Sequence, residues 1–210
     1  MNRTLPTRRL LHTHEVACEA FESDGLHDIE GRMHDITPTG TDLATARGVA
    51  QRNFVVITLG VSLREDVLAH FLALDADERT LRFGHAVRDP TIKAYVSGIR
   101  FERDVIFGAY DTRLRLVGVG HLALTGSDDA QREAEFGVSV AREARRRGIG
   151  ATLMRCALAA ARERSVGTFS LHFNAGNTAM YRIARATGMT LQCADGEMHG
   201  VVDLPPAGLQ

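Results

Sequence analysis

The sequence has little of what marks several broad classes of protein. It contains three cysteines among 210 residues, and their odd number and wide spacing exclude a disulfide framework. No apolar run approaches the roughly 20 residues that a membrane-spanning helix needs. The Arg- and Thr-rich start also lacks the apolar segment of a secretory signal. We therefore expect a cytoplasmic protein with reduced cysteines and no membrane partner.

An excess of charge of either sign is also missing. Lys and Arg number 25 against 26 Asp and Glu, so the chain lacks the basic excess of a general nucleic-acid-binding protein. Its nine histidines form no ligand set at metal-site spacing. Neither a Gly-Lys-Ser/Thr phosphate loop nor a three-glycine dinucleotide fingerprint occurs. We expect no metal and no nucleic-acid partner.

One segment in the second half of the chain carries a strong local signal. Apolar residues alternate up to Val138 and Val140, as in a half-buried strand, and recur at helical spacing from Ile149. Gly148 and Gly150 lie where the helix begins, so backbone N–H groups without an intrahelical partner can reach an anion. The three consecutive arginines before them repel one another and the helix dipole unless an anion lies there. The pattern predicts an anion-binding turn; the alternative is a solvated helix start with ordinary surface charge.

These residues resemble the pyrophosphate loop of the GNAT acetyltransferase superfamily. The pattern Arg145-x-x-Gly148-x-Gly150 is similar to the Gln/Arg-x-x-Gly-x-Gly/Ala motif of that family. The resemblance implies that acetyl-CoA is the cosubstrate and that its pantetheine arm follows a splayed strand at Val138 and Val140. It also places the pyrophosphate on the loop and the first helical turn, formed by Arg145, Arg146, Arg147, Gly148, Ile149, Gly150 and Ala151.

A second segment in the order expected for this family follows the helix. Asn177, Met180, Ala184 and Gly188 form a pattern that is similar to the acetyltransferase domain of bacterial protein-lysine acetyltransferases. The resemblance implies that Asn177 contacts the pantetheine region, while a role as the N-cap of the closing helix is equally compatible. The two roles can coexist.

The chain departs from the family where many members carry a tyrosine near the coenzyme sulfur. That position, four residues before Gly188, is Ala184 here. Tyr181 lies one helical turn earlier on nearly the same face, where it either reaches the site or packs as an ordinary core residue. The proton donor to the thiolate is therefore left open.

The order of predicted elements agrees with the resemblance over residues 54–204. Periodicity and turn signals predict strands and helices in alternation, ending in a hairpin with Asp195-Gly196 at its turn. The predicted strands are 54–59, 105–110, 114–124, 133–140, 168–173, 190–194 and 197–203, and the early helices are 63–74, 77–83 and 92–99. We expect an α/β fold, and the resemblance implies a mixed, mostly antiparallel central sheet with a splayed strand pair and flanking helices.

We expect the chain to divide into three parts. Residues 1–53 form an N-terminal extension and linker, residues 54–204 the GNAT acetyltransferase domain, and residues 205–210 a tail. Segments on either side of Ser23-Asp24-Gly25 predict a hairpin in the extension. Because an isolated hairpin is marginally stable, we expect it to pack on the domain or on another subunit. A homodimer is common in the family.

Glu135 is the candidate general base. It comes just before the strand core, where many family members place such a glutamate, and acetyl transfer requires a neutral amine. Glu133 shares its face of the strand, two residues further out. The alternative for Glu135 is an edge carboxylate in a salt bridge. Cys156 is interpreted as a structural side chain and not as a nucleophile, because periodicity predicts its helix face to be buried.

These observations lead to two main hypotheses. The first is an N-acetyltransferase that transfers an acetyl group directly from acetyl-CoA to a primary amine, either a protein lysine or a small amine. The second is a catalytically weak acyl-CoA-binding regulatory module, which the missing tyrosine and the appended extension keep open. RNA binding by the arginine cluster is a third and weaker hypothesis, because the glycines fit a compact pyrophosphate better.

Overall fold

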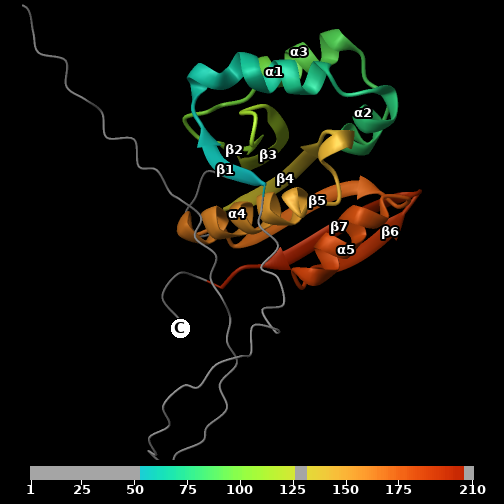
Figure 1. The fold of residues 1–210 in the computed structure, drawn as a ribbon. Helices are drawn as coiled ribbons and strands as arrows, with labels where there is room; N and C mark the ends of the chain where they lie inside the picture. The colour runs from blue at the N-terminus through green and yellow to red at the C-terminus, as the bar shows by residue number, and fades with distance from the viewer. Residues whose placement is uncertain (1–52, 126–131, 206–210) are drawn as a thin grey trace, which may run out of the picture.

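The computed structural model describes residues 53–125 and 132–205 (Figure 1). The first part contains β1 (Phe54–Leu59), the 3₁₀ turn η1 (Val61–Leu63), α1 (Arg64–Leu72), α2 (Ala76–Phe83), α3 (Asp89–Ser97), β2 (Val105–Asp111) and β3 (Leu116–Thr125). The second contains β4 (Glu133–Val140), the 3₁₀ turn η2 (Arg142–Ala144), α4 (Ile149–Glu163), β5 (Thr168–Asn174), α5 (Thr178–Ala186), β6 (Thr190–Ala194) and β7 (Glu197–Asp203). The expected N-terminal hairpin and linker lie outside the described residues, so the division into three parts stays a prediction.

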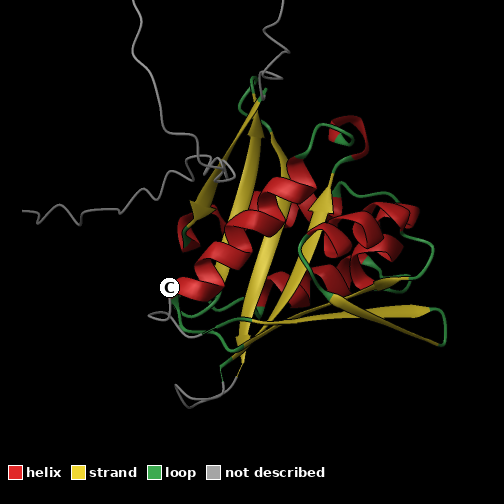
Figure 2. Ribbon diagram, turned by 90° about the horizontal axis from the view of Figure 1, so that it is seen from below, coloured by secondary structure: helices red, strands yellow, loops and turns green. Residues whose placement is uncertain are grey.

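The seven strands of the described segments form one sheet in the order β1-β2-β3-β4-β5-β7-β6. Neighbouring strands are antiparallel, with β4 and β5 as the parallel pair. The predicted α/β fold with a mixed, mostly antiparallel sheet is therefore confirmed. Helices α1, α2 and α3 lie on one face of the sheet and α4 and α5 on the other (Figures 1 and 2).

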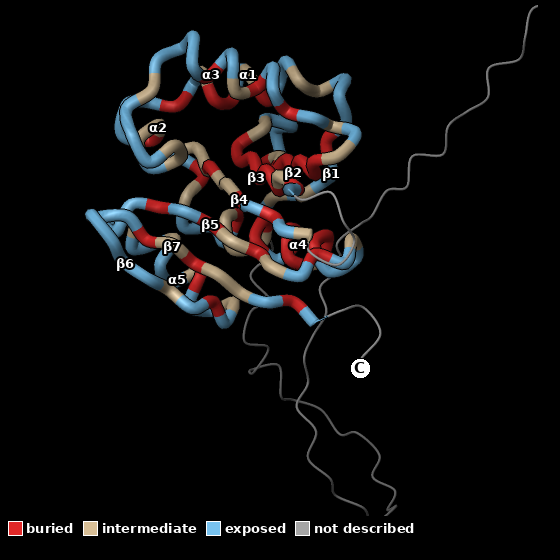
Figure 3. The backbone as a smooth tube through the Cα atoms, turned by 180° about the vertical axis from the view of Figure 1, so that it is seen from behind, coloured by how far each residue is buried: buried red, intermediate tan, exposed pale blue. Residues whose placement is uncertain are grey.

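Each face of the sheet has its own apolar core. One core joins α1 and α3 to the sheet through residues such as Phe71, Ile92 and Ile106, and the other joins α4 to the sheet through Leu153 and Phe169. The buried parts of β2, β3 and α4 stand out when the chain is seen from behind (Figure 3). Two independent cores hold the central strands from both sides, which fixes the backbone on which the site is built.

Strands β4 and β5 are paired only where they begin. Their register runs from Glu133 opposite Thr168 to Glu135 opposite Ser170. Beyond that point β4 stays paired with β3 up to Val140, while β5 continues alongside β7. The backbone of β4 after Glu135 therefore has no strand partner on its β5 side. This is the splayed pair that the resemblance implied.

Local sequence signals account for most element boundaries. The predicted bounds of β1, β4, β6 and β7 agree with the structure, and Pro90 lies in the first turn of α3 as expected. Asp75 and Glu78 form a capping box at the start of α2, each side chain accepting a hydrogen bond from the other residue's backbone N–H. The helix predicted over 63–74 begins instead as the 3₁₀ turn η1 and continues as α1.

Candidate acyl-CoA site

A cavity of about 570 Å³ lies beside the C-terminal half of β4, which β5 does not pair with. It is bounded by the C-terminal half of β4, the loop before α4 with the first turn of that helix, the start of α5, and one side of α2. Most of the predicted site residues line it, namely Val138, Val140, Arg145, Arg146, Gly148, Ile149, Gly150, Ala151 and Asn177. Residues that are 67 positions apart in the chain, such as Glu78 and Arg145, meet at its wall.

The loop before α4 takes the conformation that an anion-binding turn needs. Gly148 is the N-cap of α4 with a φ of 81°, in the left-handed region that favours glycine. Its carbonyl accepts the first hydrogen bond of the helix, from the N–H of Thr152. The N–H groups of Ile149, Gly150 and Ala151 have no carbonyl within the helix to bind. They and the positive end of the helix dipole lie at the cavity.

The absence of a side chain at Gly150 keeps this end of the cavity open. A Cβ atom placed there would lie 3.3 Å from Cδ1 of Ile183 in α5 and 3.9 Å from Cγ2 of Val140 in β4. Any longer side chain would extend into the space between the two elements. Gly150 thus adds no side chain of its own beside the N–H groups of the first helical turn.

The arginines of the loop divide into anchors and exposed cations. Arg145 donates from Nε to the Val140 carbonyl at 3.0 Å and from Nη2 to the Glu78 carboxylate at 3.0 Å. Arg142 is paired with Asp75 at 2.6 Å, which raises the pKa of the guanidinium. The first turn of α2 thus neutralises two of the arginines, and their side chains hold the loop against α2.

The remaining two arginines of the triplet differ from each other. Arg146 has a φ of 60°, is exposed and lines the cavity. Arg147 is absent from the cavity wall and donates to the Glu143 carbonyl at 3.1 Å. Of the three consecutive arginines, Arg146 therefore has the side chain best placed to reach an anion in the cavity.

Asn177 and Tyr181 on α5 have distinct positions. The Asn177 side chain accepts from the Met180 N–H at 3.1 Å, so it is the N-cap of α5 and also lines the cavity. Tyr181 is 46% exposed and is not part of the cavity wall. It neither reaches the cavity nor packs in the core. Ala184, at the position of the family's tyrosine, is fully buried.

Glu135 lies where β4 and β5 separate. It is the last β4 residue in register with β5, opposite Ser170, and its side chain is exposed. It is on the same face of β4 as Gly137 and Ser139, which contact α2 and α1 respectively. Within residues 53–125 and 132–205, no ion pair fixes its carboxylate. The salt-bridge alternative for Glu135 therefore finds no partner among the described residues.

A chain of buried polar groups lies on the face of the sheet that α1, α2 and α3 cover, and the sequence did not predict it. Arg82 of α2 donates from Nη2 to the Tyr95 hydroxyl. Nδ1 of His121 lies 2.6 Å from the same hydroxyl, and Nε2 of His121 lies 3.3 Å from Oδ2 of Asp104. Burial, reinforced by the charge of Arg82, lowers the pKa of His121. The imidazole is therefore neutral near pH 7, and its Nδ1 can accept a hydrogen bond from the Tyr95 hydroxyl.

A second buried histidine lies beneath the C-terminal half of β4. Nε2 of His70 in α1 is 2.7 Å from Oγ of Ser139, and its Nδ1 is 3.4 Å from the Leu116 carbonyl. A carbonyl accepts only, so Nδ1 carries the hydrogen and Nε2 accepts from the serine hydroxyl. Burial lowers the pKa of His70 to about 4. This hydrogen bond ties α1 to the strand that borders the cavity.

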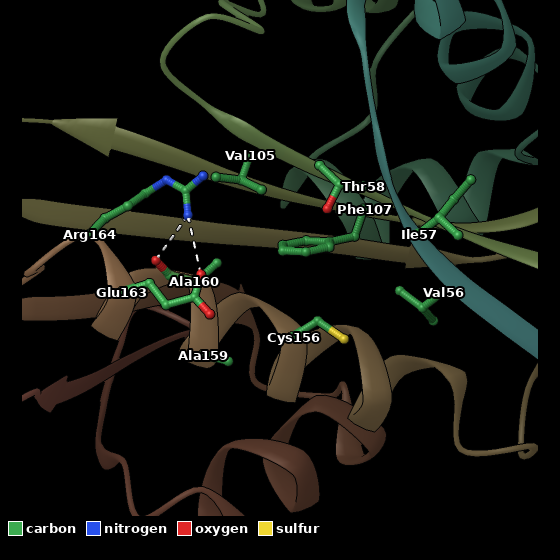
Figure 4. A pocket seen from close by; sticks show the side chains of 10 residues that line it. All are labelled: Val56, Ile57, Thr58, Val105, Phe107, Cys156, Ala159, Ala160, Glu163 and Arg164. Carbon is green, nitrogen blue, oxygen red and sulfur yellow. Dashed lines mark hydrogen bonds and ion pairs between the residues drawn. The ribbon is translucent and has the colours of Figure 1, made fainter. Parts of the chain in front are cut away.

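A second hollow, of about 80 Å³, lies between α4 and the strands β1 and β2 (Figure 4). Cys156 points into it among apolar side chains such as Val56 and Phe107, while Arg164 binds the Ala160 carbonyl and Glu163 at its rim. Cys156 is 4% exposed, which agrees with the predicted structural role. The hollow is too small for a coenzyme.

The described residues contain neither a metal-ligating cluster nor a membrane-spanning helix. No group of three or more metal-ligating side chains lies together in residues 53–125 and 132–205. No helix in that part of the chain is long and apolar enough to cross a membrane.

Solved structures with the same fold include several acetyltransferases. The GNAT domain of S. lividans PAT has a TM-score of 0.61 at 19% identity, covering 72% of this chain and 90% of that one. Ribosomal-protein-alanine N-acetyltransferase from Brucella melitensis has a TM-score of 0.57 at 22% identity, covering 71% and 99%. Spermidine N-acetyltransferase from Vibrio cholerae, in complex with CoA and spermine, has a TM-score of 0.55 at 16% identity, covering 72% and 95%.

At these identities the structural likeness establishes the fold. A comparison with curated protein sequences finds no match. The sequence pattern of the Acetyltransferase (GNAT) family matches residues 64–189, which include α1 to α5 and the whole cavity wall. This match spans more than half of the chain, so the protein belongs to the acetyltransferase (GNAT) family.

Proposed function

We propose that the protein transfers an acetyl group from acetyl-CoA directly to a primary amine. The observation that carries this proposal is the cavity at the splayed strands, which combines an unpaired strand edge with a side-chain-free helix N-terminus. A pyrophosphate requires convergent N–H donors and positive charge, and a pantetheine arm requires unpaired peptide groups. Both are present in one continuous cavity, so the residues fit the cosubstrate.

The residues divide into two groups along the length of the cosubstrate. The loop and the first turn of α4, Arg145 to Ala151, bind the pyrophosphate mainly through backbone N–H groups, with Arg146 as the side chain that adds charge. Arg145 acts by anchoring the loop to α2. The unpaired edge of β4 at Val138 and Val140 and the N-terminal end of α5 at Asn177 border the pantetheine arm.

The acceptor amine must lose a proton before it can attack the thioester carbon. Glu135 is the carboxylate on β4 where β4 and β5 separate, and it is exposed to solvent. We assign it as the general base, acting directly or through one water molecule. When bound, acetyl-CoA supplies the activated acetyl group. The thiolate that leaves takes its proton from water or from the attacking nitrogen, which carries an extra proton after the attack, because Tyr181 does not reach the cavity.

The kind of acceptor is open between a protein lysine and a small amine. The fold neighbours are named for different acceptors, with a ribosomal-protein alanine in one and spermidine in another. The GNAT domain of S. lividans PAT agrees with the resemblance of the α5 motif to protein-lysine acetyltransferases. A panel of peptides and small amines therefore has to accompany any assay.

The test is the release of CoA thiol in the presence of an acceptor panel, measured for the wild type and for Glu135→Gln. Loss of a general base lowers turnover by about 10²- to 10⁴-fold, while the affinity for acetyl-CoA, measured by calorimetry, stays the same. Glu133→Gln is the matched control, because Glu133 is also exposed and lies on the same face of β4. Equal turnover of Glu135→Gln and wild type would remove Glu135 from the mechanism.

A catalytically weak acyl-CoA-binding module is the second candidate. The observation in its favour is the buried Ala184 where many relatives have a tyrosine, together with the outward position of Tyr181. It predicts acetyl-CoA binding without CoA release for any amine of the panel. The N-acetyltransferase predicts turnover with at least one of them.

A further inference from the structure

The direction of the cosubstrate in the cavity determines where the acceptor lies. In the proposed function, on which this inference rests, the pyrophosphate lies on the loop that follows the C-terminal end of β4. The pantetheine arm then runs back along β4, because that strand has the unpaired edge. Its thioester end therefore lies toward the point where β4 and β5 separate, near Gly137 and Glu135. The acceptor amine must come within bonding distance of that point.

Arg82 occupies this point from the α2 side. It lines the cavity, and its guanidinium occupies the space beside Gly137 where a side chain would begin. A Cβ atom at Gly137 would lie 2.6 Å from Cζ and Nη2 of Arg82 and 2.8 Å from Nη1. Contacts this short do not occur in folded proteins, so the guanidinium can adopt this position because β4 has a glycine there.

The guanidinium is held among aromatic rings and has no counter-ion in the described residues. Its Cζ lies 5.5 Å from the ring centre of Phe71, 5.0 Å from that of Phe83 and 5.2 Å from that of Tyr95. The Tyr95 hydroxyl is its hydrogen-bond acceptor, and its buried Nε has no partner in this part of the chain. A neutral acceptor on one N–H leaves donor groups of this partly buried cation available to an anion.

Other arginines at or beside the cavity differ from Arg82. Arg145 faces the same helix α2 and is paired with the buried Glu78, while Arg142 is paired with Asp75. Both of these arginines have a carboxylate supplied by the protein. Arg146 and Arg182, which also line the cavity, have exposed side chains, so water solvates their charge. Arg82, in the position closest to the expected thioester, is partly buried and forms no ion pair in the described residues.

We propose that Arg82 binds a carboxylate carried by the acceptor, so that the protein acetylates amines that also bear a carboxyl group. The planar guanidinium presents parallel N–H donors that match a carboxylate. The Tyr95 hydroxyl and the rings of Phe71, Phe83 and Tyr95 fix its position before the acceptor arrives. The same cation repels polyamines, whose several ammonium groups would face it across a short distance. Arg82 therefore determines specificity, while Glu135 deprotonates the amine.

The first test observes Arg82 without any need for turnover. The buried Nε–H of Arg82 should give a resolved NMR signal, which is identified by its loss in Arg82→Lys. Titration with acetate in the presence of CoA is expected to shift this signal saturably, while acetamide of the same shape leaves it in place. Absence of a saturable shift with acetate, or an equal shift with acetamide, overturns the proposal.

The second test measures kcat/KM for pairs of amines that differ only in bearing a carboxylate or a carboxamide, such as a free amino acid and its α-amide. The wild type is expected to prefer the acids by about tenfold to a hundredfold, the contribution of one charge-assisted hydrogen bond. Arg82→Met should abolish this ratio, Arg82→Lys should retain part of it, and the exposed Arg88→Met should keep it. If Arg82 had a purely structural role, Arg82→Met would lower kcat/KM for acids and amides alike and leave their ratio unchanged. That result would contradict the proposal.

Calorimetry with acetyl-CoA on the same variants separates this inference from the proposed function. If the wild type binds acetyl-CoA and acetylates acids and amides equally well, the acceptor class is wrong and the N-acetyltransferase stands. If the wild type does not bind acetyl-CoA, the proposed function fails first, and this inference fails with it.

Discussion

Stability should fall as the pH is lowered from 6.5 to 4 because of His70. Its imidazole is buried, its Nε2 accepts from Ser139, and burial lowers its pKa from 6.5 to about 4. In the unfolded chain the same group binds a proton near pH 6.5, so between these two values the unfolded state holds one proton more than the folded state. The contribution of His70 is therefore present above pH 6.5 and is lost progressively down to about pH 4.

The size of the effect follows from the difference between the two pKa values. At 1.36 kcal/mol per pH unit, a shift from 6.5 to about 4 corresponds to about 3 kcal/mol of unfolding free energy. This is a large part of the stability of a typical domain, which is about 5–15 kcal/mol. His121, whose pKa burial also lowers, acts in the same direction.

The assay is urea unfolding of wild type and His70→Gln at several pH values between about 7 and 4. Glutamine keeps a hydrogen-bonding group near Ser139 but takes up no proton in this range. From about pH 7 to pH 4, the unfolding free energy of the wild type should fall by about 3 kcal/mol more than that of His70→Gln. The carboxylates and His121 titrate alike in both proteins, so their effects cancel in this comparison. The exposed His85→Gln is the matched control. Parallel curves for wild type and His70→Gln would refute the reasoning.

Three further substitutions test individual contacts. Gly137→Ala should displace the Arg82 guanidinium and cost about 1–3 kcal/mol of stability, measured by urea unfolding; an unchanged crystal position of Arg82 would contradict this. Glu78→Gln removes the carboxylate that holds Arg145, so it should lower stability by about 1–3 kcal/mol and weaken acetyl-CoA binding in calorimetry. Asn177→Ala removes the N-cap of α5 and should cost about 1 kcal/mol, visible as a lower Tm; an equal Tm would show that the cap contributes nothing.

The elements were predictable because each depends on nearby residues. Ile149 and Leu153 recur at helical spacing, and both are buried on the face of α4 that meets the sheet. Gly148 marked the helix start through a backbone conformation that other residues adopt only with strain. The order of these local signals was enough to recognise the resemblance to the family, and that resemblance implied the fold.

The neutralisation of the arginine cluster was not predictable from local sequence. In the sequence, three consecutive arginines look like unbalanced charge. In the structure, Arg145 is paired with Glu78 and nearby Arg142 with Asp75, each 67 positions away. Such pairs depend on how α2 lies over β4, which no local periodicity encodes. In the structure the Arg145 side chain anchors the loop to α2 and to the end of β4.

The position of Arg82 over Gly137 was not predictable from the sequence. That position depends on three separate segments, because α2 supplies the guanidinium, β4 supplies a residue without a side chain, and α3 supplies the Tyr95 hydroxyl. A glycine within a strand signals a close approach of another group, and this is the one sequence feature that pointed to it.

Calorimetric titration with acetyl-CoA is the most direct test of the central claim. Wild type should bind with a micromolar Kd, and Gly150→Glu should abolish binding because it puts a side chain and a negative charge between α4 and Ile183. Gln192→Glu adds one negative charge on the exposed strand β6 and should bind like wild type. Failure of the wild type to bind, or equal binding by Gly150→Glu, would contradict the assignment of this cavity to acetyl-CoA.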